Sequence, residues 1–196
     1  MSAYFTYFPI TSYMNVNVRD ILKRSNFIET NFSNPYVFLP YTIKDGEKPE
    51  DIAFHYYGSV DHTWLITLSN SIVDPYHQWP LSEHLFSEFI MKKYETESGK
   101  LGYDIVAWTQ SNSILENIKY YKKTNSDGKI IYVAPDTFPL IYDNDIVIGR
   151  EVEEGYEPYR IYEYEQNLNE SRREILIVDK QYHQQITKEF KKLMKQ

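Results

Sequence analysis

The hydrophobic pattern is weakest at the start of the chain. Residues 1–36 are rich in aromatic residues and asparagine, and no apolar periodicity there is long enough to form a core. The pattern predicts a short strand at residues 4–10 and a helix at residues 18–25, while Asn and Pro interrupt residues 31–35. We therefore expect an extended N-terminal arm that lies on another surface.

Helical patterns are clearest in residues 37–98. A β-rich run at residues 37–43 predicts a strand, which the turn dipeptide Asp45-Gly46 ends. Pro49 then stands where the first residue of a helix tolerates a missing N–H, and Gly58 can take the left-handed conformation that ends a helix. A strand followed by a short helix is expected here.

Two more helices are expected in the same segment. Asp61 can cap the first of them, and Asn70 can close it. A loop bracketed by prolines follows at residues 72–80. Ser82 then caps a third helix, in which apolar residues recur at helical spacing up to about Gly99.

Beyond residue 98 the pattern is mostly that of strands. Runs at residues 117–123 and 129–133 flank the turn Ser126-Asp127-Gly128 and predict a β-hairpin. Tyrosine and isoleucine alternate with charged residues at 159–165, which predicts a half-buried strand. Residues 173–178 are expected to be the antiparallel partner of that strand.

The last expected element is an amphipathic helix that begins after the cap residue Asp179. Lysines gather toward its end, where cations favour the negative pole of a helix. Its expected buried residues are Tyr182, Ile186, Phe190, Leu193 and Met194. The elements together predict an α+β protein: an extended arm (1–36), a helical module (37–98) and a β-hairpin-rich region closed by this helix (99–196).

Composition adds an unusual source of hydrophobic surface, because 19 of the 196 residues are tyrosine. Tyrosine pairs an apolar ring with a polar tip and is enriched at interfaces. The chain has no cysteine, which excludes disulfides, thiolate metal sites and cysteine nucleophiles. No apolar run reaches the length of a membrane-spanning helix, and no basic segment precedes Arg19 to predict a secretory signal.

Charge is unevenly distributed along the chain. The net charge of −7 argues against a general nucleic-acid binder. Residues 136–170 hold ten acids and two bases, whereas residues 171–196 hold three acids and seven bases. The contrast fits solvated faces of opposite sign, an internal complementarity or a docking surface.

One part of the chain resembles a LysM module. The resemblance lies in residues 41–53, then Tyr56-Tyr57-Gly58, Trp64 and Asn70. That family has a strand, a turn, a helix that ends in Tyr-Gly and a second helix that ends in Asn. The chain then departs from the family at residues 74–81, which argues against the carbohydrate binding of such modules.

A second resemblance follows from this departure. LysM-like helices followed by Asp74-Pro75-Tyr76-His77-Gln78-Trp79-Pro80 are similar to the baseplate wedge protein of contractile-tailed phages, the gene product fifty-three family. Further matches are residues 162–165, 168–170 and 172–175 and the lysine-rich last helix. The resemblance implies a structural protein of the tail baseplate in the virion, assembled in the host cytoplasm.

The resemblance also implies protein partners. They would be other wedge proteins and adjacent wedges, with six copies per baseplate joined into a ring around the tail hub. A ring closes through head-to-tail contacts, which need two different patches on one chain. Candidate interface residues are Tyr4, Phe5, Tyr7, Phe8, Tyr76, Trp79, Glu163, Glu165, Arg172 and Arg173.

Two other functions are alternatives for this sequence. A LysM-type peptidoglycan-binding module associated with a tail lytic protein would stack Trp64, Tyr76 or Trp79 on sugars, although Trp64 fits a core position better. A glycosidase would use two nearby acids, and Glu163 and Glu165 share a face of the expected strand. A solvated or docking face is the stronger interpretation of that strand, since no apolar pocket surrounds it.

Histidines are the remaining candidate chemistry. His55, His62, His77 and His84 fall within one stretch of 30 residues, but their spacing matches no common zinc pattern. Phosphate-binding glycine loops and hydrolase motifs are also absent from the sequence. We therefore expect that the protein is not an enzyme and has no catalytic or metal-binding residues. We also expect no cofactor or small-molecule ligand, and no nucleic-acid or membrane partner.

Overall fold

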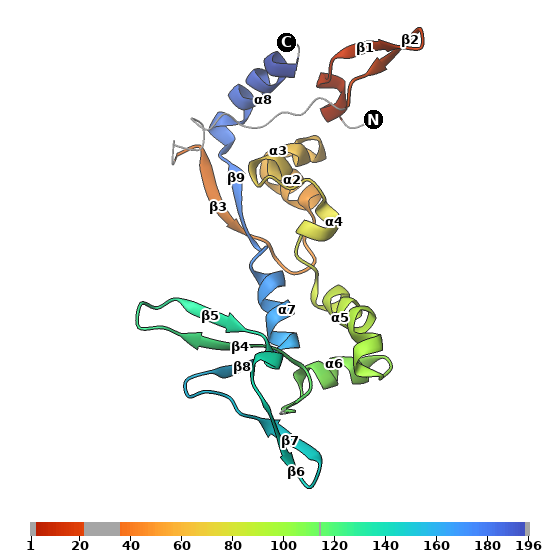
Figure 1. Cartoon of the computed structure of the whole chain (residues 1–196). Coiled ribbons are helices and arrows are strands. Elements are labelled where there is room, and N and C mark those ends of the chain that lie inside the picture. The colour runs from red at the N-terminus through yellow and green to blue at the C-terminus, as the bar shows by residue number, and fades with distance from the viewer. Residues whose placement is uncertain (1–2, 22–35, 114, 195–196) are drawn as a thin grey trace. The chain divides into compact units, whose positions relative to one another are not determined.

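A computed structural model describes residues 3–21, 36–113 and 115–194 of the chain (Figure 1). Helices and small antiparallel sheets alternate, which confirms the α+β class and the C-terminal helix. The chain divides into two compact units, and we call Met1–Pro80 with Arg172–Gln196 unit 1 and Leu81–Ser171 unit 2. These boundaries differ from the expected three segments, because the last strand and helix pack onto elements from the first half of the chain.

Unit 1 is built around one strand pair and several short helices. Strand β3 (Phe38–Thr42) runs antiparallel to β9 (Glu174–Val178), with Phe38 opposite Val178 and Thr42 opposite Glu174. The other elements of the unit are η1 (Ala3–Tyr7), β1 (Ile10–Tyr13), β2 (Val16–Arg19), α2 (Pro49–Tyr57), η2 (Val60–His62), α3 (Thr63–Ser69), α4 (Pro75–Gln78) and α8 (Lys180–Met194).

Local sequence features set the helix ends of unit 1. Pro49 is the first residue of α2, and Gly58 ends it with a φ of 84°, as expected. Asn70 ends α3, also as expected. The expected cap Asp61 is wrong, because Ser59 accepts the Asp61 N–H at 3.2 Å and a 3-10 turn precedes α3.

The beginning of the chain differs from the expected strand and helix. Residues 3–7 form the 3-10 helix η1 in place of a strand at 4–10, because Phe8 packs into the core and the turn brings Tyr4 and Tyr7 against it. Val18 and Arg19 belong to β2, so the helix expected at 18–25 is wrong there. Asp20 and Ile21 are not helical either, and residues 22–25 and the interruptions at 31–35 lie outside the described residues.

Two apolar clusters fill unit 1, and β3, β9 or the residues beside them contribute to both. One comprises Phe8, Val37, Phe38, Trp64, Leu65, Val178, Ile186, Phe190 and Met194. The other comprises Ile43, Ile52, Ala53, Ile66, Trp79, Ile175 and Ile177. In α8 the expected Ile186, Phe190 and Met194 are buried and Tyr182 packs against the first cluster, whereas Leu193 is exposed.

Unit 2 combines helices with a three-stranded antiparallel sheet in the order β5-β4-β8. The expected hairpin is confirmed as β4 (Ile118–Thr124) and β5 (Ile130–Val133). Its other elements are α5 (Glu83–Ser98), α6 (Tyr103–Gln110), η3 (Pro135–Thr137), β6 (Leu140–Asp143), β7 (Ile146–Arg150), β8 (Glu157–Arg160) and α7 (Ile161–Glu170). Ser82 caps α5 as expected, with its side chain 3.4 Å from the Leu85 nitrogen.

The strand expected at 159–165 is wrong beyond Arg160. From Ile161 the chain is helical, because Ile161, Glu165 and Asn169 recur every fourth residue and all three are buried on one face of α7. The expected pairing of this segment with residues 173–178 is wrong as well. Residues 174–178 pair with β3, where their alternating Ile175 and Ile177 enter the core of unit 1.

Candidate interaction surfaces

Three of the ten candidate interface residues lie inside the units. Phe8 is 4% exposed and Trp79 is 8% exposed, both within the apolar clusters of unit 1. The Trp79 Nε1 donates a hydrogen bond to the Glu47 carbonyl at 2.8 Å, which holds the indole ring in the apolar cluster. In unit 2, Glu165 is 4% exposed.

Glu165 is held by two donors from α5. One of its carboxylate oxygens accepts hydrogen bonds from Lys93 Nζ at 2.7 Å and from Tyr94 Oη at 2.6 Å. Burial, and then the nearby Glu165 carboxylate, raise the pKa of Tyr94. This buried carboxylate therefore serves the packing of α7 against α5.

Glu163 has a different environment. It accepts a hydrogen bond from Lys122 Nζ at 2.8 Å, and its side chain is 46% exposed. Because both acids lie on helix α7, residues two apart point to different sides, and the shared strand face expected for a glycosidase pair is wrong. The two carboxylates have separate lysine partners and do not form an acid pair.

The aromatic residues of η1 divide between core and surface. Tyr4 stacks on Trp64 at 5.8 Å and on Phe190 at 5.7 Å between ring centroids. Tyr7 lies under Lys191 Nζ, 4.6 Å from its ring centroid. Phe5 is 49% exposed, whereas Tyr4 and Tyr7 are only partly exposed, so Phe5 is the most accessible of the three large aromatic residues of this helix.

Sequence reasoning missed the hairpin that follows η1. Strands β1 and β2 pair antiparallel, and every residue of both is exposed. Tyr13 lies opposite Val16 and Thr11 opposite Val18, so these four residues share one face of the ribbon. The sequence does carry a sign of this surface, since residues 1–18 contain no charged side chain.

The hairpin is fixed at its base. Arg19 Nη1 donates to the carbonyl oxygens of Thr6 at 2.6 Å and Phe8 at 2.8 Å. The Asp20 N–H donates to the Pro9 carbonyl at 2.9 Å. Because Phe8 is in the core, these bonds tie the exposed ribbon to the interior of unit 1.

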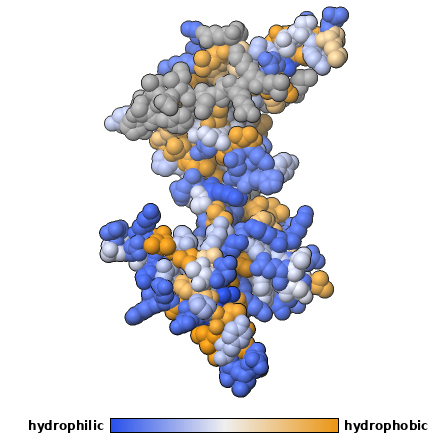
Figure 2. Space-filling model, viewed as in Figure 1, coloured by the Kyte–Doolittle hydropathy of each residue, from blue (hydrophilic) through white to orange (hydrophobic). Residues whose placement is uncertain are grey.

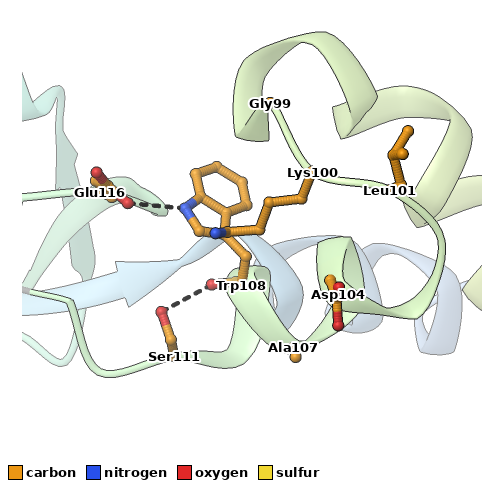
Figure 3. Close-up of a pocket in the computed structure, with 8 residues that line it drawn as sticks. All are labelled: Gly99, Lys100, Leu101, Asp104, Ala107, Trp108, Ser111 and Glu116. Carbon is orange, nitrogen blue, oxygen red and sulfur yellow. Dashed lines mark hydrogen bonds between the residues drawn. The ribbon is translucent and has the colours of Figure 1, made fainter.

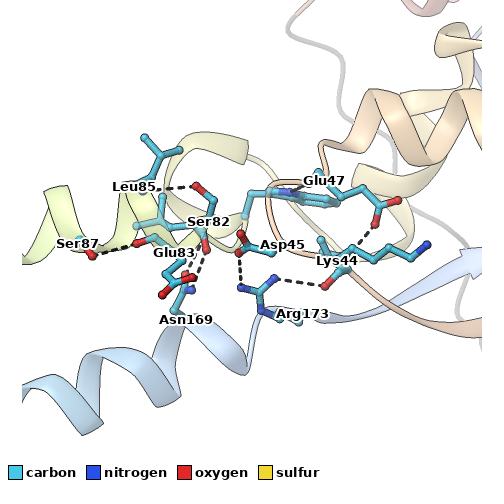
Figure 4. A network of polar contacts seen from close by, with 12 residues as sticks. Lys44, Asp45, Glu47, Ser82, Glu83, Leu85, Ser87, Asn169 and Arg173 are labelled. Carbon is cyan, nitrogen blue, oxygen red and sulfur yellow. Dashed lines mark hydrogen bonds and ion pairs between the residues drawn. The ribbon is translucent and has the colours of Figure 1, made fainter.

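The remaining candidate interface residues also differ in their exposure. Tyr76, in α4, is 90% exposed. The expected loop at 72–80 contains this single helical turn because Asp74 caps it, accepting from the Tyr76 N–H at 3.0 Å. Arg172 is exposed, whereas Arg173 donates to the Ile43 carbonyl at 3.3 Å and contacts Asp45 at 3.2 Å (Figure 4).

One histidine of the sequence cluster has a partner from far along the chain. His183 Nε2 on α8 lies 3.1 Å from His62 Nδ1 on η2, and Tyr57 stacks on His183 at 5.3 Å. Burial lowers the pKa of both imidazoles, and His62 lowers that of His183 further. Within the described residues no group of three or more histidines and acids is arranged to hold a metal ion.

Unit 2 has a surface depression of about 710 Å³, lined by residues of the α5–α6 connection and α6 (Figure 3). Trp108 lines it, and its Nε1 donates to Glu116 at 2.9 Å. Lys100 and Asp104 also border it. The depression thus combines one indole with side chains of both charges.

The described residues thus present separate exposed surfaces and no assembled catalytic constellation. A comparison with protein families supplies the class of molecule. A model of the family described as Base plate wedge protein 53 matches residues 4–195. The chain belongs to this family.

As a member of the Base plate wedge protein 53 family, the chain is a phage baseplate wedge protein and a structural component of the virion tail. Association with other baseplate proteins follows from this membership. A comparison with curated proteins returned no match. Among the described residues, no helix is both long and apolar enough to cross a bilayer.

Proposed function

We propose that this wedge protein joins neighbouring wedge proteins into the ring around the tail hub, with six copies per baseplate. A closed ring of wedges uses head-to-tail contacts, in which one patch of a chain meets a different patch on its neighbour. Family membership supports a role in the wedge. The surface that best supports a joining role is the β1–β2 hairpin.

The apolar face of this hairpin carries the proposal. Tyr13, Val16 and Val18 are 62%, 60% and 37% exposed, and they lie on the same side of the ribbon. A two-stranded hairpin without further support is marginally stable in water, and its outer edges offer unpaired backbone groups. Contact with a partner would bury both the apolar face and an open edge.

The attachment of the hairpin favours a joining role over a loose tether. Arg19 bonds the hairpin to the backbone of η1, and Phe8 and Tyr4 anchor η1 in the core of unit 1. A rigid base limits the conformational entropy that binding would cost. Of the predicted interface residues, Phe5 and Tyr76 remain exposed apolar candidates in the same unit.

The peptidoglycan alternative has little support from the aromatic residues that would stack on sugars. Trp64 and Trp79 are 6% and 8% exposed and belong to the two clusters of unit 1. Neither indole offers an open face. Tyr76 alone among the three proposed stacking residues is accessible.

A charge on the apolar face of the hairpin tests the proposal. We expect Val16→Asp to weaken binding to the adjoining wedge protein about tenfold or more, because burying an unpaired carboxylate is costly. The binding of the purified chain to each other wedge protein would be measured by sedimentation. Baseplates would be counted by electron microscopy after complementation of a phage that lacks the gene.

Ser12→Asp is the matched control. Ser12 lies opposite Asn17 on the other side of the ribbon. The substitution therefore adds the same charge to the same hairpin but leaves the face of Tyr13, Val16 and Val18 unchanged. We expect near wild-type binding and ring formation from this variant. Normal rings and normal binding with Val16→Asp would contradict the proposed role of the hairpin.

A further inference from the structure

Unit 2 carries a second exposed hairpin, β6–β7, whose chemistry differs from that of β1–β2. Its apolar side chains are well exposed, with Tyr142 at 60%, Ile146 at 67% and Ile148 at 52%. Leu140 and Ile141 add to this surface at 38% and 41%. Figure 2 shows apolar side chains gathered over this hairpin and hydrophilic ones at its tip.

The strand register distributes these residues over both faces. Tyr142 lies opposite Val147, and Leu140 opposite Arg150. The other face carries Ile141 together with the pair Asp143 and Ile146. No third strand pairs with β6 or β7 among the described residues, so both edges of the ribbon are open.

The root of the hairpin is firmly packed within unit 2. Phe138, just before β6, is 5% exposed and meets the ring of Tyr121 on β4 edge-on at 5.1 Å. Arg150 Nη1 donates to the Phe138 carbonyl at 3.0 Å, and the Glu151 N–H donates to the Pro139 carbonyl at 2.8 Å. The tip turns through Asn144 and Asp145, both with positive φ, as in a tight two-residue hairpin turn.

Acidic side chains border the apolar surface. Asp143 and Asp145 lie at the tip, and Glu151 and Glu153 follow the second strand, all of them exposed. Arg150 is the only base in residues 139–156, and its guanidinium is directed to the Phe138 carbonyl. No ion pair involving these four acids occurs within the described part of the chain.

We propose that the β6–β7 hairpin is a docking surface for a different baseplate protein, one that presents an apolar strip bordered by lysine or arginine. The inference rests on the proposed joining function and gives the chain a second contact patch, separate from the β1–β2 hairpin. The apolar side chains provide the buried area. The four carboxylates select a basic partner and exclude an acidic one.

A second copy of the chain fits this hairpin poorly. Its basic helix is α8, but Lys180 lies over the Tyr56 ring at 4.9 Å and Lys191 over the Tyr7 ring at 4.6 Å. The exposed side of α8 otherwise carries glutamines, Glu189 and a single apolar residue, Leu193, beside Lys188 and Lys192. That surface offers little apolar area to cover the isoleucines and tyrosine of the hairpin.

Two variants separate the apolar and charged contributions. Ile146→Asp places a charge on the apolar surface, and Glu151→Lys/Glu153→Lys reverses the charge at its border. We expect each to weaken binding of the purified chain to one other purified wedge protein at least tenfold at 100 mM salt. For the wild type, binding should also weaken between 50 and 300 mM salt, and the charge-reversal variant should lose this dependence.

Matched controls come from the same unit. Ile130 on β5 is 46% exposed and Glu95 and Glu97 on α5 are exposed, so Ile130→Asp and Glu95→Lys/Glu97→Lys make equivalent changes away from the hairpin. Both should bind as the wild type does. Circular dichroism and thermal melting check that all variants fold. We expect them to fold, because the root of the hairpin is packed and the substituted side chains are exposed.

Several results would overturn the inference. They are unchanged binding by both hairpin variants, tighter binding after charge reversal, or self-association of the chain that Ile146→Asp abolishes. The proposed function is tested separately by Val16→Asp in unit 1. Loss of binding with Ile146→Asp but not with Val16→Asp would retain this docking surface and reject the β1–β2 hairpin as the joining element.

Discussion

The two units of this wedge protein hold their interiors together by different means. Unit 1 combines the two ends of the chain around apolar and aromatic side chains, with Trp64 stacked on Phe190 at 4.5 Å. Unit 2 is one continuous segment and buries charged and polar groups among its apolar ones. Glu165 is the clearest case, and Asn117 is a second.

Asn117 illustrates how unit 2 uses polar side chains. It is 4% exposed and donates to the Trp108 and Ser111 carbonyls, while its Oδ1 accepts from Arg160 Nη1 at 2.9 Å. Such groups connect the sheet to the helices, but they stabilise the fold only when every partner is present. Unit 1 should therefore be sensitive to lost volume and unit 2 to lost partners.

The largest effect is expected from emptying the aromatic stack of unit 1. Trp64→Ala should lower the free energy of unfolding by about 3–5 kcal/mol, because a buried indole is replaced by a cavity. Chemical denaturation followed by circular dichroism measures it. Tyr76→Ala, at a 90% exposed position, should change stability by less than about 0.5 kcal/mol. A loss below about 1 kcal/mol for Trp64→Ala would break the contrast between the units.

An intermediate effect is expected from the buried carboxylate of unit 2. Glu165→Ala removes the acceptor of both Lys93 and Tyr94 and should cost about 1–3 kcal/mol. Glu163→Ala is the comparison within the same helix, and its half-exposed pair with Lys122 should contribute at most about 1 kcal/mol. Equal losses for the two variants, measured by denaturation, would remove the distinction between buried and exposed acids.

The smallest effect concerns a titratable contact in unit 1. The pKa values of His62 and His183 lie below the ordinary value of 6.5, so the unfolded chain binds more protons just below that pH. Stability from this pair is therefore complete above about pH 6.5 and falls as the solution is acidified. Asp61 raises the pKa of His62 and Lys191 lowers it, and both remain in the variants.

Melting temperatures at pH 7.5 and 5.5 measure this dependence. His183→Gln should reduce the difference in melting temperature between pH 7.5 and pH 5.5, because the variant has lost one of the two imidazoles whose pKa burial lowers. His84→Gln, which changes an exposed histidine of unit 2 that lies 3.3 Å from Glu88, serves as the control. The same pH dependence in His183→Gln and the wild type would assign the acid sensitivity to other groups.

Features that depend on a few neighbouring residues were predictable from the sequence. Pro49 and Gly58 mark the ends of α2, Ser82 marks the start of α5, and a turn ending in Gly128 joins β4 to β5. Each is a local preference of the backbone, which tertiary contacts reinforce. The α+β class follows from these elements.

Features that depend on distant partners were not predictable. The segment 159–165 satisfies both a strand and a helix pattern, and the buried contact of Glu165 with Lys93, 72 residues away, accompanies the helix. Trp79 lies between prolines like an exposed anchor, yet the Glu47 carbonyl holds it in the core. Among the candidate surfaces, the charge-free start of the chain was visible in the sequence, but the ribbon it forms was not.

The pairing of β3 with β9 has a consequence for how the chain folds during translation. Thr42 and Glu174, whose side chains bond at 3.0 Å, are separated by 132 residues. Translation supplies every residue of unit 2 before it supplies β9, and domains generally fold as units during synthesis. Until β9 and α8 emerge, β3 lacks its partner strand, and the two apolar clusters of unit 1 lack six of their sixteen residues. The nascent wedge protein thus completes its first-made unit last.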